Sequence, residues 1–177
     1  FRSHGPESPS LRNMTDPHQA SERIPFPAPI PYIESLGVEL LEMADGRSVA
    51  AMTPKPEHRN SWGVVHGGVL MALLDFAMSM ASRSAVRPAG AGSAEAGTPS
   101  APAKPAAAAE AAAPPTEGSL TVEMKTSFLR PARGRLTVTG RCLQPGRSLS
   151  FCEAEIADAG GALIARASGT FKFWSKQ

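Results

Sequence analysis

The sequence predicts an α+β domain in which a curved antiparallel sheet covers a single long helix. Two β-like segments come first, and an apolar segment of helical character follows them. Four more β-like segments then complete the pattern. In chain order, the expected elements span residues 36–43, 48–53, 67–84, 120–129, 135–143, 148–157 and 162–173.

The first two strands are predicted by β-forming residues on either side of a turn. The turn is Ala44-Asp45-Gly46-Arg47, whose residue types are typical of a hairpin connection. Pro54 and Pro56 follow the second strand and should end it, because proline lacks the N–H that a sheet needs. These residues predict a hairpin at the start of the domain.

The long helix is expected from Gly67 to Ser84, ending before Pro88. It is apolar on nearly every side except at Asp75, Ser79 and Ser82, so other structure must wrap it. The apolar run within it, residues 69–81, is too short to span a bilayer and contains a carboxylate. A buried core helix is the prediction, and no membrane partner is expected.

Turn residues separate the last four strands and predict an antiparallel meander. The three joints are Pro131-Ala132-Arg133-Gly134, Pro145-Gly146 and Asp158-Ala159-Gly160-Gly161. Together with the hairpin and the helix, they give one domain over residues 32–174.

Two other segments lack apolar periodicity. Residues 1–31 are rich in proline, serine and charge, so we expect a disordered tail. Residues 88–118 are almost entirely Ala, Pro, Gly, Ser and Thr, which predicts an insert. A linker is the simpler interpretation of this insert, and a functional lid is the alternative.

Composition excludes several classes of protein. The formal net charge is +2 and the arginines are scattered, so the basic stripe of a nucleic-acid binder is missing. The histidines show no ligand spacing with cysteines or carboxylates, so no metal or cofactor is expected. No charged-then-apolar leader opens the chain, and a cytoplasmic location is the expectation.

The two cysteines are expected to be free. A two-residue loop at Pro145-Gly146 would place Cys142 opposite Leu149 instead of Cys152, which predicts two free buried thiols.

The start of the long helix is a candidate anion site. His66-Gly67-Gly68 offers unpaired backbone N–H groups, a partial positive charge and room for a close approach. A thioester carbonyl oxygen bound to the N–H of Gly67 or Gly68 would be stabilised as negative charge develops on it. The alternative is that the glycines only permit a tight turn.

Asp75 strengthens the chemical interpretation, because a carboxylate within an apolar helix is costly without partners or a task. It can attack a thioester directly or take a proton from water that does so. Asn60 could donate to the substrate or hold this water, and the Thr121 hydroxyl could orient it. Structural roles are the alternative for each: a satisfied buried carboxylate, a turn former and a strand residue.

Eight residues separate Gly67 from Asp75, which is about 12 Å along a helix axis. One helix therefore cannot place both at one carbonyl. Two antiparallel copies that cross near Met71 would set Gly67 of one chain opposite Asp75 of the other. The spacing predicts at least a homodimer with two shared sites.

The chain resembles the hotdog-fold acyl-CoA thioesterases of the phenylacetate-pathway (PaaI-like) type. The residues that carry the resemblance are Asn60, Gly63, His66-Gly67-Gly68 and Asp75, followed by the segments 120–124, 128–132 and 146–149. The resemblance covers about two thirds of the chain, and the insert at 88–118 is its main departure from the family.

The resemblance implies a six-stranded antiparallel sheet wrapped around one long central helix, in dimers and often in dimers of dimers. Coenzyme A would enter between subunits, near His66 and Gly68. Gly67 would polarise the carbonyl, Asp75 of the partner subunit would be nucleophile or general base, and Asn60 and Thr121 would assist. Cations near the strand ends are candidates for binding the phosphates of coenzyme A: Arg130, Arg133 and Arg147.

The predicted activity is hydrolysis of a small aromatic or short- to medium-chain acyl-CoA to the free acid and coenzyme A. Two alternatives remain at this point. A hotdog-fold hydratase or dehydratase would use His66 with Asp75, and a non-catalytic acyl-CoA-binding module would use the same pocket without chemistry.

Overall fold

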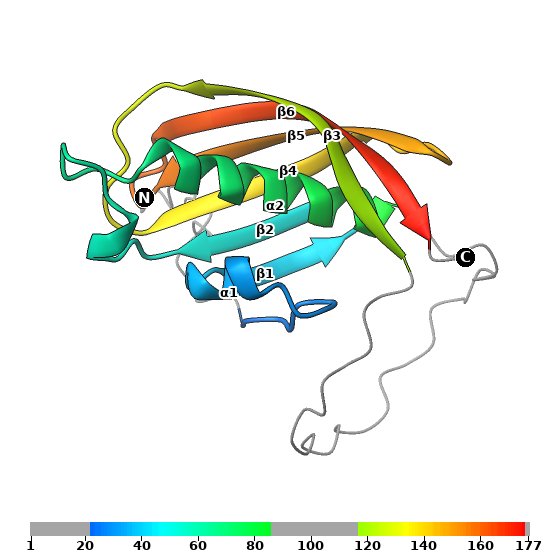
Figure 1. Ribbon diagram of the computed structural model, residues 1–177, viewed down its shortest axis with the longest axis horizontal. Helices are drawn as coiled ribbons and strands as arrows, with labels where there is room; N and C mark the ends of the chain where they lie inside the picture. Colours follow the sequence, from blue (N-terminus) through cyan, green and yellow to red (C-terminus); the bar gives the residue numbers. More distant parts are fainter. Residues whose placement is uncertain (1–21, 86–116, 176–177) are drawn as a thin grey trace, which may run out of the picture.

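The computed structural model describes residues 22–85 and 117–175. Figure 1 shows one long helix lying across the hollow face of a curved sheet. In chain order, the elements are α1 (Pro31–Ser35), β1 (Glu39–Ala44), β2 (Arg47–Met52), a 3₁₀ turn (Pro56–His58), α2 (Gly67–Ala85), β3 (Glu117–Phe128), β4 (Leu136–Gln144), β5 (Leu149–Asp158) and β6 (Leu163–Ser175). The predicted sequence of two strands, one helix and four strands is confirmed.

The six strands form one antiparallel sheet in the order β1-β2-β4-β5-β6-β3. The predicted meander is correct for β4, β5 and β6 but wrong for β3, which pairs with β6 at the edge of the sheet. Turn residues predict that the chain reverses, but they do not fix which strand comes next to which. The connection from β3 to β4 contacts the loop before α2, where the carbonyl of buried Ala132 accepts a hydrogen bond from the Val65 N–H at 3.1 Å.

Alternating burial along the strands builds the core. In β4 and β5 every second side chain faces α2, as shown by buried Leu136, Val138 and Ile156. The helix contributes Leu73 and Met78 to the same core. Each such side chain contributes about 1.5–3 kcal/mol when it is fully buried. The helix is therefore fixed against the sheet along most of its length.

Gly140 on β4 sets how closely α2 approaches the sheet. A Cβ atom at this position would lie 2.3 Å from the carbonyl oxygen of Ala77 on the helix. The same oxygen accepts a hydrogen bond from the Ser48 hydroxyl at 2.7 Å. Only a residue without a side chain allows this close packing, which fixes the depth at which α2 sits.

The prediction of a disordered tail is wrong for residues 22–31. The Ile24 N–H donates to the Leu40 carbonyl at 2.9 Å, and the Phe26 ring packs edge-on against Phe76 with centroids 5.6 Å apart. The apolar residues between the prolines supply enough contact to order this segment, which leads into α1. Residues 1–21 and most of the predicted insert lie outside the described residues, and β3 already begins at Glu117.

The predicted register of the β4–β5 hairpin is also wrong, because Cys142 pairs with Cys152 and not with Leu149. The connection is longer than two residues, and the register shifts between Cys142 and Gln144. Both thiols are nevertheless free. Burial raises the pKa of Cys152 to about 12. Within the described ranges, no helix is long and apolar enough to cross a membrane.

Candidate active site

His66 caps the first turn of α2. Its Nδ1 atom accepts a hydrogen bond from the Gly68 N–H at 2.9 Å, and its carbonyl accepts one from the Val69 N–H at 3.0 Å. The Gly67 N–H has no hydrogen-bond partner among the described residues. Of the two predicted oxyanion donors, Gly67 is thus the one available to a ligand, and Gly68 helps to hold the turn.

Asn60 shapes the loop that leads into this turn. Its side-chain oxygen accepts hydrogen bonds from the N–H groups of Trp62 at 2.9 Å and Val64 at 3.4 Å. Gly63, at the tip, has a φ of +68°, which favours glycine. Because the oxygen of Asn60 is used within the loop, its NH₂ group is the part that can act on a substrate. Asn60 is a turn former, as one of the two alternatives predicted, and its role as a donor to the substrate stays a prediction.

Asp75 lies half-buried in the middle of α2 and is held by β3. The Thr121 hydroxyl donates to its Oδ1 atom at 2.6 Å. One turn further along the helix, the hydroxyls of Ser79 and Ser119 are 2.7 Å apart. The sequence prediction missed Ser119, because it adjoins the insert and carries no motif, and it treated Ser79 only as a polar interruption. Thr121 therefore lies with Asp75 and orients its carboxylate.

β3 runs alongside α2 in the opposite direction. Thr121 meets Asp75 at one point, and Phe128 lies beside Gly67, where a Cβ would come within 3.5 Å of its ring. The two chemical groups of the helix stay about 12 Å apart along its axis. Within a single chain these two groups are thus too far apart to act on one carbonyl.

The three candidate arginines do not form one cluster. Arg133 donates to the Gly63 carbonyl at 3.2 Å, and Arg130 donates to the Leu163 carbonyl at 2.7 Å. Both belong to the end of the sheet where α2 begins. Arg147 lies in the β4–β5 connection at the other end, where the Ser150 hydroxyl contacts Ser82 near the end of the helix. Only Arg130 and Arg133 share the end that holds Gly67.

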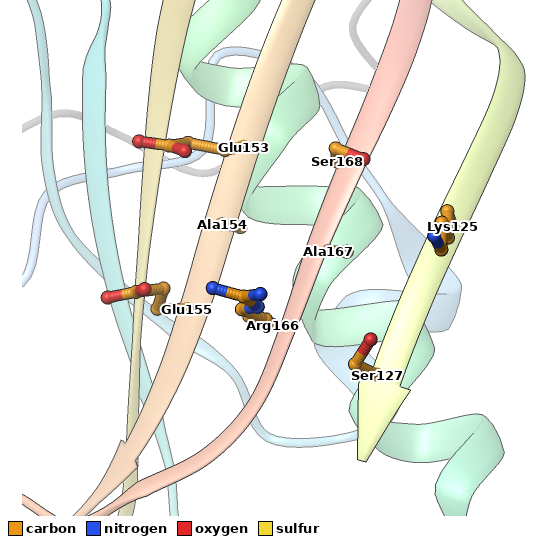
Figure 2. A pocket seen from close by; sticks show the side chains of 8 residues that line it. All are labelled: Lys125, Ser127, Glu153, Ala154, Glu155, Arg166, Ala167 and Ser168. Atoms are coloured by element: carbon orange, nitrogen blue, oxygen red, sulfur yellow. The ribbon is translucent and has the colours of Figure 1, made fainter. Parts of the chain in front are cut away.

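A hollow of about 220 Å³ opens beside Asp75, between α1 and α2. Another hollow lies on the outer face of the sheet and is lined by charged and small side chains of β3, β5 and β6. Figure 2 shows these side chains with α2 behind the strands: Lys125, Ser127, Glu153, Ala154, Glu155, Arg166, Ala167 and Ser168. None of the predicted site residues lines this outer hollow. No group of three potential metal ligands occurs within residues 22–85 and 117–175.

One helix held in a curved six-stranded antiparallel sheet is the hotdog fold, and the helix carries a carboxylate and an available backbone donor. These features fit both the hotdog-fold hydrolases and the hydratases considered above. The model of the thioesterase superfamily matches residues 63–165, which is more than half of the chain. The chain belongs to the thioesterase superfamily, and it is a thioester hydrolase.

Relatives and solved structures agree with this assignment. A protein from Saccharolobus solfataricus, provisionally named as an esterase, is 28% identical over 159 residues, covering 89% of this chain and 93% of the relative. The structure of a conserved protein from Pseudomonas aeruginosa is 26% identical with a TM-score of 0.62, covering 81% and 94% of the two chains. The PaaI protein of E. coli shares the fold, with 20% identity, a TM-score of 0.60 and coverage of 80% and 82%.

The superfamily assignment favours hydrolysis over the hydratase interpretation, and the geometry agrees. The Nδ1 atom of His66 is occupied by the Gly68 N–H. Nine residues also separate His66 from Asp75, which is roughly 13 Å along the helix. The two residues do not form a pair within one chain.

Proposed function

We propose that this protein hydrolyses an acyl-coenzyme A thioester with a small aromatic or short- to medium-chain acyl group, releasing the free acid and coenzyme A. The observation that carries the proposal is Asp75, held by Thr121 beside a mostly apolar hollow. The available N–H of Gly67 on the same helix supplies the second chemical group. No cofactor is part of the proposal, because water is the only other reactant.

In the proposed mechanism, the thioester carbonyl oxygen accepts a hydrogen bond from the Gly67 N–H, helped by the dipole of α2. Thr121 occupies Oδ1 of the carboxylate and leaves Oδ2 for the reaction. As a general base, Asp75 takes a proton from water, which attacks the carbonyl carbon and displaces the coenzyme A thiolate. As a nucleophile, it forms a mixed anhydride with loss of the thiolate, and water then cleaves the anhydride.

The proposal requires a homodimer with two shared sites. β3 lies at the edge of the sheet, and an exposed edge strand presents unpaired backbone groups to another chain. Large apolar side chains are exposed along this strand, among them Leu120, Val122 and Phe128. An edge strand with this composition favours pairing with the same strand of a second copy.

Two further observations support a partner on this side of the molecule. Met71, midway between Gly67 and Asp75, is 40% exposed although it lies on the central helix. The Thr126 hydroxyl on β3 is buried without a hydrogen-bond partner among the described residues. A buried, unsatisfied hydroxyl costs about 1–3 kcal/mol, so a partner chain or a ligand is expected to satisfy it. A two-fold axis near Met71 would bring Gly67 of one subunit to Asp75 of the other.

The same proposal includes a dimer of dimers, a cytoplasmic location and phosphate binding by arginines. Arg130 and Arg133 lie at the Gly67 end and are the better candidates for the phosphates of coenzyme A. Arg147 could take part only through an assembly that brings the other end of a sheet to this site.

Release of free thiol from a panel of acyl-CoAs tests the proposal, with Asp75→Asn as the matched variant. The amide keeps the size of the side chain but is neither a base nor a nucleophile, so kcat should fall about 10²–10⁴-fold while acyl-CoA binding persists. Unchanged turnover in Asp75→Asn would overturn the role of this residue. Hydration of crotonyl-CoA without thiol release would overturn the activity itself.

A further inference from the structure

The hollow beside Asp75 lies where α1 covers the middle of α2. Ile30, Tyr32 and Ile33 form the α1 side of the hollow. The remaining lining residues come from α2: Ala72, Asp75, Phe76, Ser79 and Met80. The candidate catalytic carboxylate is therefore part of the wall of a defined space, and α1 contacts the helix that forms the opposite wall.

Three of the apolar residues that line the hollow are packed into the core. Ile33, Phe76 and Met80 are exposed by only 6%, 3% and 2% of their surface. The Phe76 ring is held further by edge-on contact with Phe26, at an interplanar angle of 83°. Because these side chains are packed from behind, they cannot move aside cheaply to admit a longer group.

Two of the polar side chains of the hollow, Asp75 and Ser79, lie on α2 towards β3, and the third, Tyr32, lies on the α1 side. Asp75 and Ser79 both bond to hydroxyls of β3, through Thr121 and Ser119. A ligand that enters the hollow therefore meets the Asp75 carboxylate and the Ser79 hydroxyl on the β3 side, and on the α1 side it meets isoleucine side chains and the phenol of Tyr32. This polarity suits an acyl group whose carbonyl stays at Asp75 while its hydrocarbon part points towards α1.

We infer that this hollow is the acyl-binding pocket and that Ile33 and Met80 set the maximum size of the acyl group. This inference rests on the proposed function. The volume of about 220 Å³ is smaller than the roughly 300–1,000 Å³ of pockets that hold drug-sized ligands. The pocket accepts one aromatic ring or a short chain and rejects a long fatty acyl chain. The substrates are accordingly aryl-acyl or short-chain acyl thioesters.

The test compares kcat/KM over straight-chain acyl-CoAs from acetyl to palmitoyl, together with benzoyl- and phenylacetyl-CoA. Ile33→Ala and Met80→Ala enlarge the pocket, and the preferred chain should lengthen. One methylene in an apolar pocket changes kcat/KM about 10–200-fold, so the ratio of kcat/KM for octanoyl-CoA to that for butanoyl-CoA should rise at least tenfold. Ala72→Phe fills the pocket and should lower the ratio of kcat/KM for phenylacetyl-CoA to that for acetyl-CoA by a similar factor.

Ile156→Ala is the matched control, because Ile156 is fully buried in the core but does not line the pocket. It carries the same loss of side-chain volume as Ile33→Ala, so its acyl preference should match that of the unchanged protein. A shift of equal size in Ile156→Ala would attribute the effect to general loosening of the core and overturn the inference.

A second measurement separates this inference from the proposed function. Calorimetric binding of the same acyl-CoAs and of free coenzyme A is measured with Asp75→Asn, alone and combined with Ile33→Ala or Ala72→Phe. If no thioester is hydrolysed but binding depends on acyl size and changes in the pocket variants, the proposed activity is overturned and the assignment of the acyl pocket is supported. If thioesters are hydrolysed with the same size preference in all variants, the proposed activity is supported and the assignment of the acyl pocket is overturned. Acyl-CoAs bound no better than coenzyme A would also overturn the pocket.

Discussion

Replacing Gly67 with proline deletes the backbone N–H that we assign to the substrate carbonyl. Gly67 is the first residue of α2, where proline is tolerated because that N–H makes no bond within a helix. Its N–H has no partner among the described residues, so folding should lose little when it is removed. The His66 cap, which bonds to Gly68, stays in place.

The expected loss can be estimated from the role of a single donor. Removing one oxyanion-hole donor lowers kcat by about 10²–10³. Gly67→Ala is the control, since it keeps the N–H and adds a methyl group that would lie 3.5 Å from the Phe128 ring, an ordinary contact. We expect the kcat of Gly67→Ala to stay within about tenfold of that of the unchanged protein. The difference in kcat between Gly67→Pro and Gly67→Ala then measures the contribution of the N–H itself.

Mixing Gly67→Pro with Asp75→Asn tests whether the sites are shared. A mixed dimer would combine the intact Gly67 of one chain with the intact Asp75 of the other and would contain one complete site. After unfolding and refolding an equal mixture, half of the dimers are mixed, so about a quarter of the original activity should return. Thiol release from a good acyl-CoA measures the activity, and differently tagged chains confirm that mixed dimers form.

Two results would refute this reasoning. A folded Gly67→Pro protein with full turnover would show that the N–H does not stabilise the transition state. A mixture that contains mixed dimers but stays inactive would show that Gly67 and Asp75 do not serve one site from two chains. In that case Gly67 and Asp75, about 12 Å apart at a helix rise of about 1.5 Å per residue, would not act on the same carbonyl.

Two further predictions concern stability. Gly140→Ala should lower the free energy of unfolding by about 1–3 kcal/mol in urea titrations, because its methyl group would push α2 off the sheet. Gly118→Ala, where no atom lies within 4 Å of the added carbon, is the control, and equal stability of the two variants would contradict the prediction. The pKa of the Cys152 thiol rises from 9.0 to about 12 on folding, so the unfolded chain loses this proton first as pH rises. The stabilisation from this thiol is complete below pH 9.0 and is lost towards pH 12. Urea titrations from pH 8 upward should therefore show a steeper loss of stability in the unchanged protein than in Cys152→Ala, and parallel curves would argue against it.

Local patterns in the sequence predicted the elements well. The helix predicted at 67–84 ends one residue later, and each strand lies close to its predicted range. These predictions succeed because apolar periodicity, prolines and turn residues act over only a few neighbouring positions. Asp75 was identifiable for a similar reason, since a carboxylate in an apolar helix stands out without any knowledge of its surroundings.

Two of the failures involve partners that are distant along the chain, and the third involves the register of a hairpin. The position of β3 beside β6, the pairing of Cys142 with Cys152 and the packing of Phe26 on Phe76 depend on which segments meet in space. Local periodicity contains little information about such contacts. A turn residue can fix a reversal, but loop length and bulges decide the register that follows it.

The sequence by itself determined the fold class, the resemblance to the hotdog thioesterases and the two candidate positions on the helix, Gly67 and Asp75. Only the tertiary structure decided that Gly68 bonds to His66 and leaves Gly67 available, and that Thr121 holds Asp75 across 46 residues of chain. It also placed α1 over α2 and so formed the hollow beside the carboxylate. The physical reason is that the residue types are set locally, whereas hydrogen-bond partners and cavities exist only after distant segments have packed together.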